Sequence, residues 1–331
     1  MFCRIDTQNG PFAVVPRELE GALVSNEFPL YKVDAEAFHP RFLALCFLRR
    51  SVLRGIGSAR NGRDGRARWK ESDFVMQLVP KPPLAVQRRI INVIAAVDEA
   101  IDTLDDEAVA LIKLMAAVRQ SLLADAPSKP LGDLCAISAK LVDPRLPEHA
   151  ELPHMGVDAI EKSTGRLLPM RSAKEDGVIS GKFLVSPGQV VLSKVRPALR
   201  KACTPDVPVL CSADAYPLAP ADGVHPGVLR EVLLEDSFTA QVVMASDRAK
   251  MPKFNRKQLF TTSVKWPEDE NDRERVVAST DAIRVQIQAV ADERDRLGTV
   301  REDLLENLLK GEIHVLPADG VPADSRGVLS P

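Results

Sequence analysis

Two stretches of the chain have the apolar spacing of a long helix. In residues 88–125, apolar side chains recur at alternating intervals of four and three, at Ile90, Ile94, Val97, Ile101, Leu104, Ala108, Leu111, Met115, Val118 and Leu122. This heptad spacing predicts a coiled-coil helix. The paired prolines Pro82 and Pro83 mark a place where the helix can begin. At a rise of about 1.5 Å per residue, such a helix is a rod of about 50 Å.

The second stretch, residues 271–313, keeps the same phase with fewer apolar residues. They are Val276, Ile283, Ile287, Val290, Leu297, Leu304 and Leu308. Thr280, Arg294 and Arg301 occupy positions of the same series, so the apolar stripe is weaker here. A helix with one apolar stripe must bury it, and the first helix matches this one in length. An intramolecular antiparallel pair is therefore favoured over a homo-oligomeric coiled coil, the alternative that the pattern leaves open.

The two helices belong to a repeat of the whole chain. His-Pro occurs at 39–40 and again at 225–226, and the same offset of 186 aligns Ile90 with Val276. Further upstream, MFCRIDTQNGPFAVVP aligns with VVLSKVRPALRKACTP after an indel of four residues. The repeat predicts an α+β fold with two tandem globular α/β domains, each followed by a long helix, and the two helices pair as an antiparallel coiled coil.

The pattern divides the chain into five parts. We expect a first domain at 1–87, its helix at 88–125, a second domain at 130–270, its helix at 271–313 and a flexible tail at 314–331. Met1 aligns with Val191, so 61 positions of the second domain have no counterpart in the first. We therefore expect the first domain to be incomplete at its N-terminus. A start codon assigned too far downstream, a decayed gene or a half-domain completed by another chain would each explain this.

The composition is that of an ordinary soluble protein. The chain has 331 residues, of which 45% are hydrophobic and 27% are charged, which excludes global disorder and a fibrous chain. No apolar run has the length of a membrane span and no signal peptide is recognisable, so the expected location is the cytoplasm. The five cysteines include no C-x-x-C pair. We expect them to be reduced and mostly buried, not disulfide-bonded or bound to zinc.

The net charge of −2 conceals an uneven distribution. Residues 1–87 carry +4 and residues 130–270 carry 0, whereas residues 88–124 carry −2 and residues 271–331 carry −4. Acidic segments thus alternate with less acidic ones. This segregation indicates that different parts of the chain contact different partners.

Each repeat contains a polar, basic segment between its His-Pro and its long helix. The segments are GSARNGRDGRARWK at 57–70 and SDRAKMPKFNRK at 246–257, and strand-like apolar runs follow at 74–79 and 259–266. Arg and Lys neutralise phosphates, and Arg and Asn can contact base edges. Recurrence in both copies favours a nucleic-acid site over a merely solvated loop. The candidate DNA-binding residues are Arg60, Asn61, Arg63, Arg66, Arg68, Lys70, Arg248, Lys250, Lys253, Asn255, Arg256 and Lys257.

A second set of polar residues precedes the basic segments in both copies. It lies in CRIDTQNG and in SKVRPALRK, and its members are Arg4, Asn9, Lys194, Arg196, Arg200 and Lys201. We include them among the candidate DNA-binding residues. The alternative for the basic ones is a charge on an edge strand that prevents aggregation.

No catalytic constellation is visible in the sequence. Residues 177–182 approach a phosphate-binding loop but have the wrong spacing. His149 and His154 are five residues apart, so they do not share a helix face as a metal pair would. His39 and His225 stand beside proline, which is typical of a structural turn. No catalytic, cofactor-binding or metal-binding residue is predicted, and the chain is not expected to be an enzyme.

Taken together, these duplicated motifs resemble the DNA-specificity subunit of type I restriction-modification systems. The resemblance covers nearly the whole chain to about residue 313. The segments that carry it are CRIDTQNGPFAVVP at 3–16, ELEGALVSNEFPLYKVD at 18–34, PKPPLAVQRRI at 80–90, SKVRPALRKA at 193–202 and DLLENLLKGEI at 303–313.

The resemblance implies a non-catalytic, sequence-specific DNA-recognition and scaffold subunit. Two target-recognition domains would each read half of a bipartite site in double-stranded DNA. The implied protein partners are methyltransferase (modification) subunits and a restriction (motor-nuclease) subunit. No association with a membrane is implied. S-adenosylmethionine, ATP and Mg²⁺ would belong to those partners, so no cofactor is expected in this chain. The alternative is a truncated coiled-coil adaptor that no longer recognises DNA but still binds methyltransferase subunits.

Overall fold

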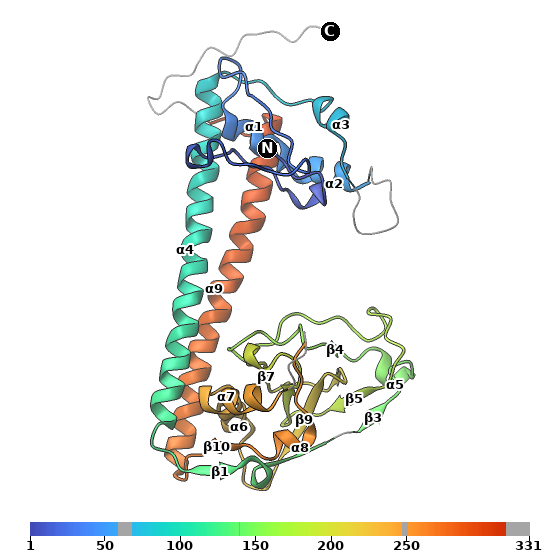
Figure 1. Ribbon diagram of the computed structural model, residues 1–331, viewed down its shortest axis with the longest axis vertical. Coiled ribbons are helices and arrows are strands. Elements are labelled where there is room, and N and C mark those ends of the chain that lie inside the picture. The colour runs from blue at the N-terminus through green and yellow to red at the C-terminus, as the bar shows by residue number, and fades with distance from the viewer. Residues whose placement is uncertain (59–67, 139, 247–250, 316–331) are drawn as a thin grey trace. The chain divides into compact units, whose positions relative to one another are not determined.

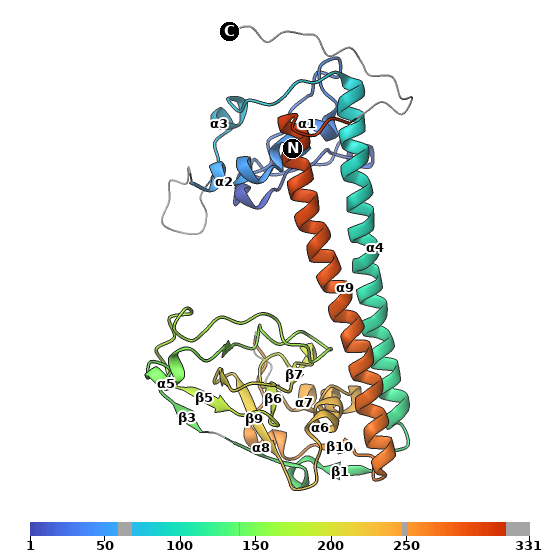
Figure 2. The same cartoon turned by 180° about the vertical axis from the view of Figure 1, so that it is seen from behind.

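The chain forms two compact units in a computed structural model that describes residues 1–58, 68–138, 140–246 and 251–315 (Figures 1 and 2). Unit 1 consists of Met1–Asp105 with Asp292–Pro331, and unit 2 consists of Asp106–Ala291. Two long helices, α4 (Leu84–Leu123) and α9 (Glu270–Lys310), supply residues to both units. Among the described residues, no helix has the length and hydropathy needed to cross a membrane.

Within each unit, α4 and α9 pair side by side in antiparallel orientation (Figures 1 and 2). In unit 1, Asp98 pairs with Arg301, and Asp105 pairs with Arg294 at 3.1 Å. In unit 2, Leu123 of α4 and Val276 of α9 lie in one apolar cluster. These contacts confirm the predicted antiparallel pair. They also show that the two arginines in the weaker α9 stripe face aspartates of α4.

Short helices surround a cluster of aromatic rings in unit 1. The ring centroid of Phe2 lies 4.8 Å from that of Phe74 and 5.5 Å from that of Trp69. The elements are η1 (Thr7–Asn9), η2 (Arg17–Leu19), α1 (Pro40–Phe47), α2 (Arg50–Ser58) and α3 (Glu71–Val75). The expected strand at 74–79 is wrong. Phe74 and Val79 pack against the ring cluster, but Val75, Met76 and Leu78 are exposed, and residues 71–75 form the short helix α3 instead of a strand.

Unit 2 contains two four-stranded sheets and a two-stranded ribbon. The first sheet has the antiparallel order β2 (Cys135–Ile137), β9 (Ala215–Pro220), β6 (Val190–Ser193), β7 (Ala202–Cys203). The second has the order β3 (Leu141–Val142), β5 (Lys182–Val185), β8 (Val209–Cys211), β4 (His154–Met155), in which only the β4–β8 pair is parallel. The ribbon is β1 (Ser128–Pro130) with β10 (Ser263–Lys265), so the apolar run expected at 259–266 is a strand only in part.

Strand β6 lies at the centre of the unit 2 core. Val190 and Leu192 pack into a cluster with the helices, whereas Val191 packs into a second cluster with residues of the other sheet. This follows from the alternation of side chains along a strand. The helices and turns of the unit are η3 (Leu131–Asp133), α5 (Pro147–Ala150), η4 (Pro197–Leu199), α6 (Pro226–Leu233), α7 (Asp236–Ala245) and α8 (Arg256–Leu259).

The His-Pro pairs of the repeat are helix caps. His39 precedes α1, and its Nδ1 accepts the amide N–H of Arg41 at 3.3 Å. His225 precedes α6, and its Nδ1 accepts the amide N–H of Gly227 at 3.1 Å. In each case proline is the first helical residue, where its missing N–H costs nothing. The prediction of a structural turn is confirmed.

Loss of this cap has a measurable cost. We expect His225→Ala to lower the free energy of unfolding of unit 2 by about 1 kcal/mol, because an amide at the start of α6 loses its acceptor. His225→Asn supplies another capping acceptor and should retain most of the stability. Urea unfolding of the two variants measures the difference, and equal midpoints would contradict the capping role.

All five cysteines are free thiols. Four are buried, as predicted, and Cys3 is partly exposed. Burial raises the pKa of Cys46, Cys135 and Cys211 to about 12. These thiols are therefore protonated and unreactive at neutral pH.

Candidate nucleic-acid interface

A tight turn between β6 and β7 carries two of the predicted basic residues. Arg196 and Arg200 lie on either side of η4, and both have left-handed backbone conformations with φ of 49°. Pro197, the first residue of η4, restricts the turn. The turn therefore holds two arginines four residues apart at the end of a hairpin whose strands are buried.

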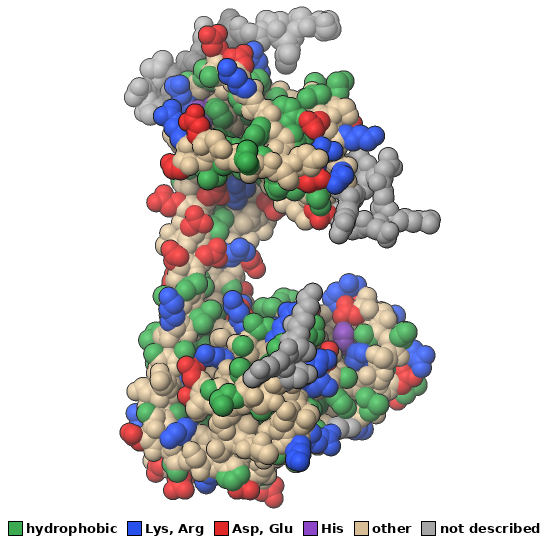
Figure 3. All heavy atoms as spheres, viewed as in Figure 1, with side chains coloured by type: hydrophobic (Ala, Val, Ile, Leu, Met, Phe, Trp, Pro, Cys, Tyr) green, Lys and Arg blue, Asp and Glu red, His purple; other side chains and the backbone are tan. Residues whose placement is uncertain are grey.

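The fold brings the second basic segment against this turn. Val195 and Lys253 form an isolated β-bridge. The amide N–H of Arg196 donates to the carbonyl of Pro252 at 2.8 Å, and that of Phe254 donates to the carbonyl of Lys194 at 3.3 Å. Two segments that are about fifty residues apart in the sequence thus form one basic cluster, which consists of Lys194, Arg196, Arg200, Lys201, Lys253, Arg256 and Lys257. Lys and Arg side chains on unit 2 are visible in Figure 3.

An aromatic anchor holds the second segment in place. Phe254 is buried in the main core of unit 2, and the hydroxyl of Tyr216 donates to its carbonyl at 3.1 Å. The ammonium group of Lys194 lies 5.6 Å from the centre of the Tyr216 ring, within range of a cation–π interaction. Asn255 caps α8 through a reciprocal pair of hydrogen bonds with Gln258, at 2.9 and 2.7 Å. The cap occupies Oδ1 of Asn255 and leaves its side-chain NH2 as a donor.

Some basic side chains of the cluster already form ion pairs or hydrogen bonds with neighbouring groups. Lys253 pairs with Asp214 at 3.2 Å, and Arg200 pairs with Asp236. Lys201 donates to the carbonyl of Val157 at 2.7 Å, and burial lowers its pKa. Arg196, Lys253, Arg256 and Lys257 are exposed, and of these four Lys253 has the ion pair with Asp214. Arg248 and Lys250 lie outside the described residues.

Unit 1 repeats this construction with different residues. Asp6 and Gly10 flank η1 in left-handed conformations, with φ of 53° and 78°. The bridge between Ile5 and Arg68 corresponds to the one between Val195 and Lys253 in unit 2. The amide of Trp69 donates to the carbonyl of Arg4 at 2.9 Å, as Phe254 does to Lys194. The repeat predicted from the sequence is therefore a repeat of structure at this site.

The predicted residues of unit 1 are also partly paired. Arg4 lies 3.3 Å from Glu71, and Arg68 pairs with Glu27. Asn9 and Lys70 are exposed. The remaining predicted residues, Arg60, Asn61, Arg63 and Arg66, lie outside the described residues.

Sequence reasoning missed the acidic partners of these basic residues. The backbone carbonyls of Glu27 and Asp214 accept the backbone N–H groups of Arg4 and Lys194, respectively. The carboxylate of each acid forms an ion pair with the basic residue of the bridge. The two acids occupy matching places in SNEFPL and SADAYPL, which was the available signal. They set the direction of the basic side chains while lowering the local positive charge.

A buried ionic network attaches the helix pair to α6 within unit 2. Glu231 is fully buried and accepts hydrogen bonds from Arg119 of α4 at 2.9 Å, Arg230 at 2.7 Å and Arg284 of α9 at 2.6 Å. Arg230 also pairs with Asp281 at 2.7 Å. Burial alone would raise the pKa of Glu231, but the three guanidinium groups hold it below its ordinary value. Glu231 therefore remains ionised.

His149 and His154, the two histidines considered as a metal pair, have other partners. A ring nitrogen of His154 lies 2.9 Å from the carboxylate of Asp176, and one of His149 lies 3.0 Å from the carbonyl of Asp143. In the described part of the chain, no three His, Cys, Asp or Glu side chains are grouped so that they could hold a metal ion.

Comparisons with known proteins point to one family. No protein-family model matches the chain. The type I restriction enzyme EcoDI specificity subunit of Escherichia coli is 30% identical over 184 residues, which are 54% of this chain and 40% of that protein. The chain thus aligns with less than half the length of this curated relative.

One solved structure shares the fold. A chain described with the complex assembly and conformational transition of the type I R-M system has a TM-score of 0.55 at 19% identity, over 94% of this chain and 81% of that chain. The S subunit from M. genitalium has a TM-score of 0.47 at 13% identity, over 84% of this chain and 74% of its own. The chain is thus similar in sequence, over 184 residues, to a type I restriction enzyme specificity subunit, and it shares the fold of a chain from a type I R-M system.

Proposed function

We propose that the chain is the DNA-recognition and scaffold subunit of a type I restriction-modification complex. The observation that carries the proposal is that a β-bridge joins Ile5 to Arg68 in unit 1 as one joins Val195 to Lys253 in unit 2, so that predicted basic residues from two distant segments meet in each unit. Two such sites in one chain suit a bipartite DNA target, with one half-site for each unit. The cations give affinity through the phosphates, and contacts with base edges give specificity.

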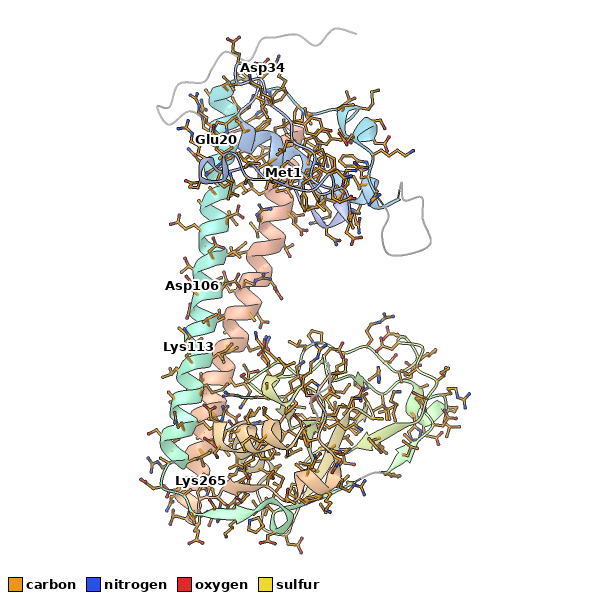
Figure 4. The ribbon with its side chains drawn as sticks, in the orientation of Figure 1. Met1, Glu20, Asp34, Asp106, Lys113 and Lys265 are labelled. Atoms are coloured by element: carbon orange, nitrogen blue, oxygen red, sulfur yellow. The ribbon has the colours of Figure 1, made fainter. Side chains whose placement is uncertain are left out.

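The paired helices favour protein partners over DNA. The middle of α4 exposes five acidic side chains, Glu99, Asp102, Asp105, Asp106 and Glu107. Figure 3 shows acidic side chains along this helix, and Figure 4 marks Asp106 and Lys113 on it. Negative charge here repels phosphates, so we assign this surface to methyltransferase and restriction subunits. Those partners would carry the catalysis together with S-adenosylmethionine, ATP and Mg²⁺.

Charge reversal at the exposed cations of unit 2 tests the DNA-binding role. In the double variant Arg256→Glu and Lys257→Glu, we expect the affinity for a mixed-sequence DNA duplex to fall by at least about tenfold, because phosphate contacts are lost. The slope of log affinity against log salt concentration should flatten by about 2, or roughly 0.9 for each contact. Fluorescence anisotropy at several salt concentrations measures both quantities.

A matched control carries the same change of charge elsewhere on unit 2. Lys113→Glu with Lys265→Glu alters residues of α4 and β10 that lie outside the basic cluster (Figure 4). We expect its affinity and salt slope to match those of the unmodified chain. Unchanged affinity in the Arg256 and Lys257 variant would refute the site. Methyltransferase binding without any DNA affinity in the unmodified chain would support the adaptor role instead.

A further inference from the structure

The two arginines in the turn of unit 2 are in backbone conformations that disfavour them. A left-handed conformation suits glycine and, to a lesser degree, Asn and Asp, because other side chains crowd the backbone. Unit 1 follows this preference at the equivalent turn, with Asp6 and Gly10. Unit 2 has Arg196 and Arg200 in the same two places. One copy of the repeat therefore has favoured residue types where the other has arginine.

Backbone contacts hold Arg196 in this conformation. Its N–H donates to the carbonyl of Pro252 at 2.8 Å, and its carbonyl accepts the N–H of Leu199 at 2.9 Å. The residue is exposed, and no hydrogen bond or ion pair joins its guanidinium to another residue within the described ranges. Arg200, by contrast, is paired with Asp236. Hydrogen bonds and ion pairs within the described residues therefore do not explain the arginine at position 196.

Strained backbone conformations that a fold preserves are concentrated at functional sites. On the basis of the DNA-recognition function proposed above, we propose that Arg196 contacts duplex DNA directly. A role in DNA binding would account for an arginine at a position where glycine is favoured. The guanidinium extends from a rigid hairpin in the same cluster as Arg256 and Lys257, and its planar fork suits a phosphate or a guanine edge. Unit 1 has no cation at either left-handed position, so the two units contact DNA differently at this turn.

Arg196→Gly in the full chain separates a DNA contact from a structural role. Glycine relieves the strain, so the thermal midpoint of the variant should be unchanged or raised. Its affinity for a mixed-sequence duplex should nevertheless fall by about tenfold, and the salt slope should flatten by about 0.9. Arg196→Lys keeps the charge, so its salt slope should match that of the unmodified chain.

Ser163→Gly is the matched control. Ser163 is another non-glycine residue of unit 2 with positive φ, at 66°, and it is not a candidate DNA-binding residue. Its backbone N–H donates to the carbonyl of Arg200, which glycine preserves. We expect full DNA affinity in this variant. Unchanged affinity and salt slope in Arg196→Gly would overturn the assignment of Arg196 alone, as would a lowered thermal midpoint. No DNA binding by the unmodified chain would overturn the proposed function as well.

Discussion

Replacement of Glu231 by Leu is expected to lower the free energy of unfolding of unit 2 by about 3–5 kcal/mol. The substitution leaves three guanidinium groups, of Arg119, Arg230 and Arg284, with Asp281 as their remaining ionic partner in the described network. Removing one partner of a buried ion pair costs this much because the other charge stays buried without compensation. Trp266 lies in the adjacent core, so its fluorescence in a Trp69→Phe background reports the unfolding of unit 2.

The repeat supplies the compensating change. At the positions of unit 1 that correspond to Glu231 and Arg119, the chain has Leu45 and Leu305, which lie together in one apolar cluster. Adding Arg119→Leu to Glu231→Leu should therefore recover part of the lost stability, with a coupling of about 0.5–3 kcal/mol. The exposed control Glu148→Leu should change stability by no more than about 0.5 kcal/mol. Strict additivity of the two leucine substitutions would contradict the pairing.

The same network predicts how the effect depends on pH. The pKa of Glu231 in the folded chain is below its ordinary value of 4.5. Its contribution to stability is therefore fully present above the unfolded-state pKa and is lost as the pH falls through the folded-state pKa. The difference between the unmodified chain and Glu231→Leu should narrow as the pH falls below about 4.5. A difference that stays constant across this range would show that the carboxylate charge contributes nothing.

Phe2→Ala is expected to lower the free energy of unfolding of unit 1 by about 3–5 kcal/mol. Phe2 is 1% exposed, and its ring contacts those of Phe12, Tyr31, Trp69 and Phe74. Truncation removes the apolar contacts and leaves a cavity among rings that cannot close completely. Trp69 fluorescence in a Trp266→Phe background measures the unfolding of unit 1. Phe28→Ala, at a residue that is 37% exposed, is the control, and equal costs for the two variants would contradict the central place of Phe2.

Helix periodicity was the most informative part of the sequence. Spacings of three and four place apolar side chains on one face of a helix, whatever the helix packs against. The spacing therefore predicts helices at residues 88–125 and 271–313 without knowledge of tertiary contacts. The structure has helices at Leu84–Leu123 and Glu270–Lys310. The short strands of unit 2 were harder to predict. They contain two to six residues, and β6 is buried on both faces, so they show little alternation.

The candidate site was predicted as two unconnected sets of basic residues. Their residue types predict a DNA-binding surface, and their repetition favours that prediction. The pairing of Lys253 with Asp214, of Arg68 with Glu27 and of Arg200 with Asp236 could not be read from spacing, because the partners are 36 to 41 residues apart. These ion pairs distinguish the basic residues that have an acidic partner from Arg196, Arg256 and Lys257.

The sequence alone determined the long helices and the duplication, because each rests on local spacing or on self-similarity. Only the tertiary structure decided which basic residues share a surface, which of them have acidic partners, and that Glu231 collects three arginines from three helices. The charge pattern of a sequence shows which charged groups are present, but not which of them are in contact. The free energy of an ion pair or a DNA contact depends on distance and burial, and the fold sets both by bringing distant segments together.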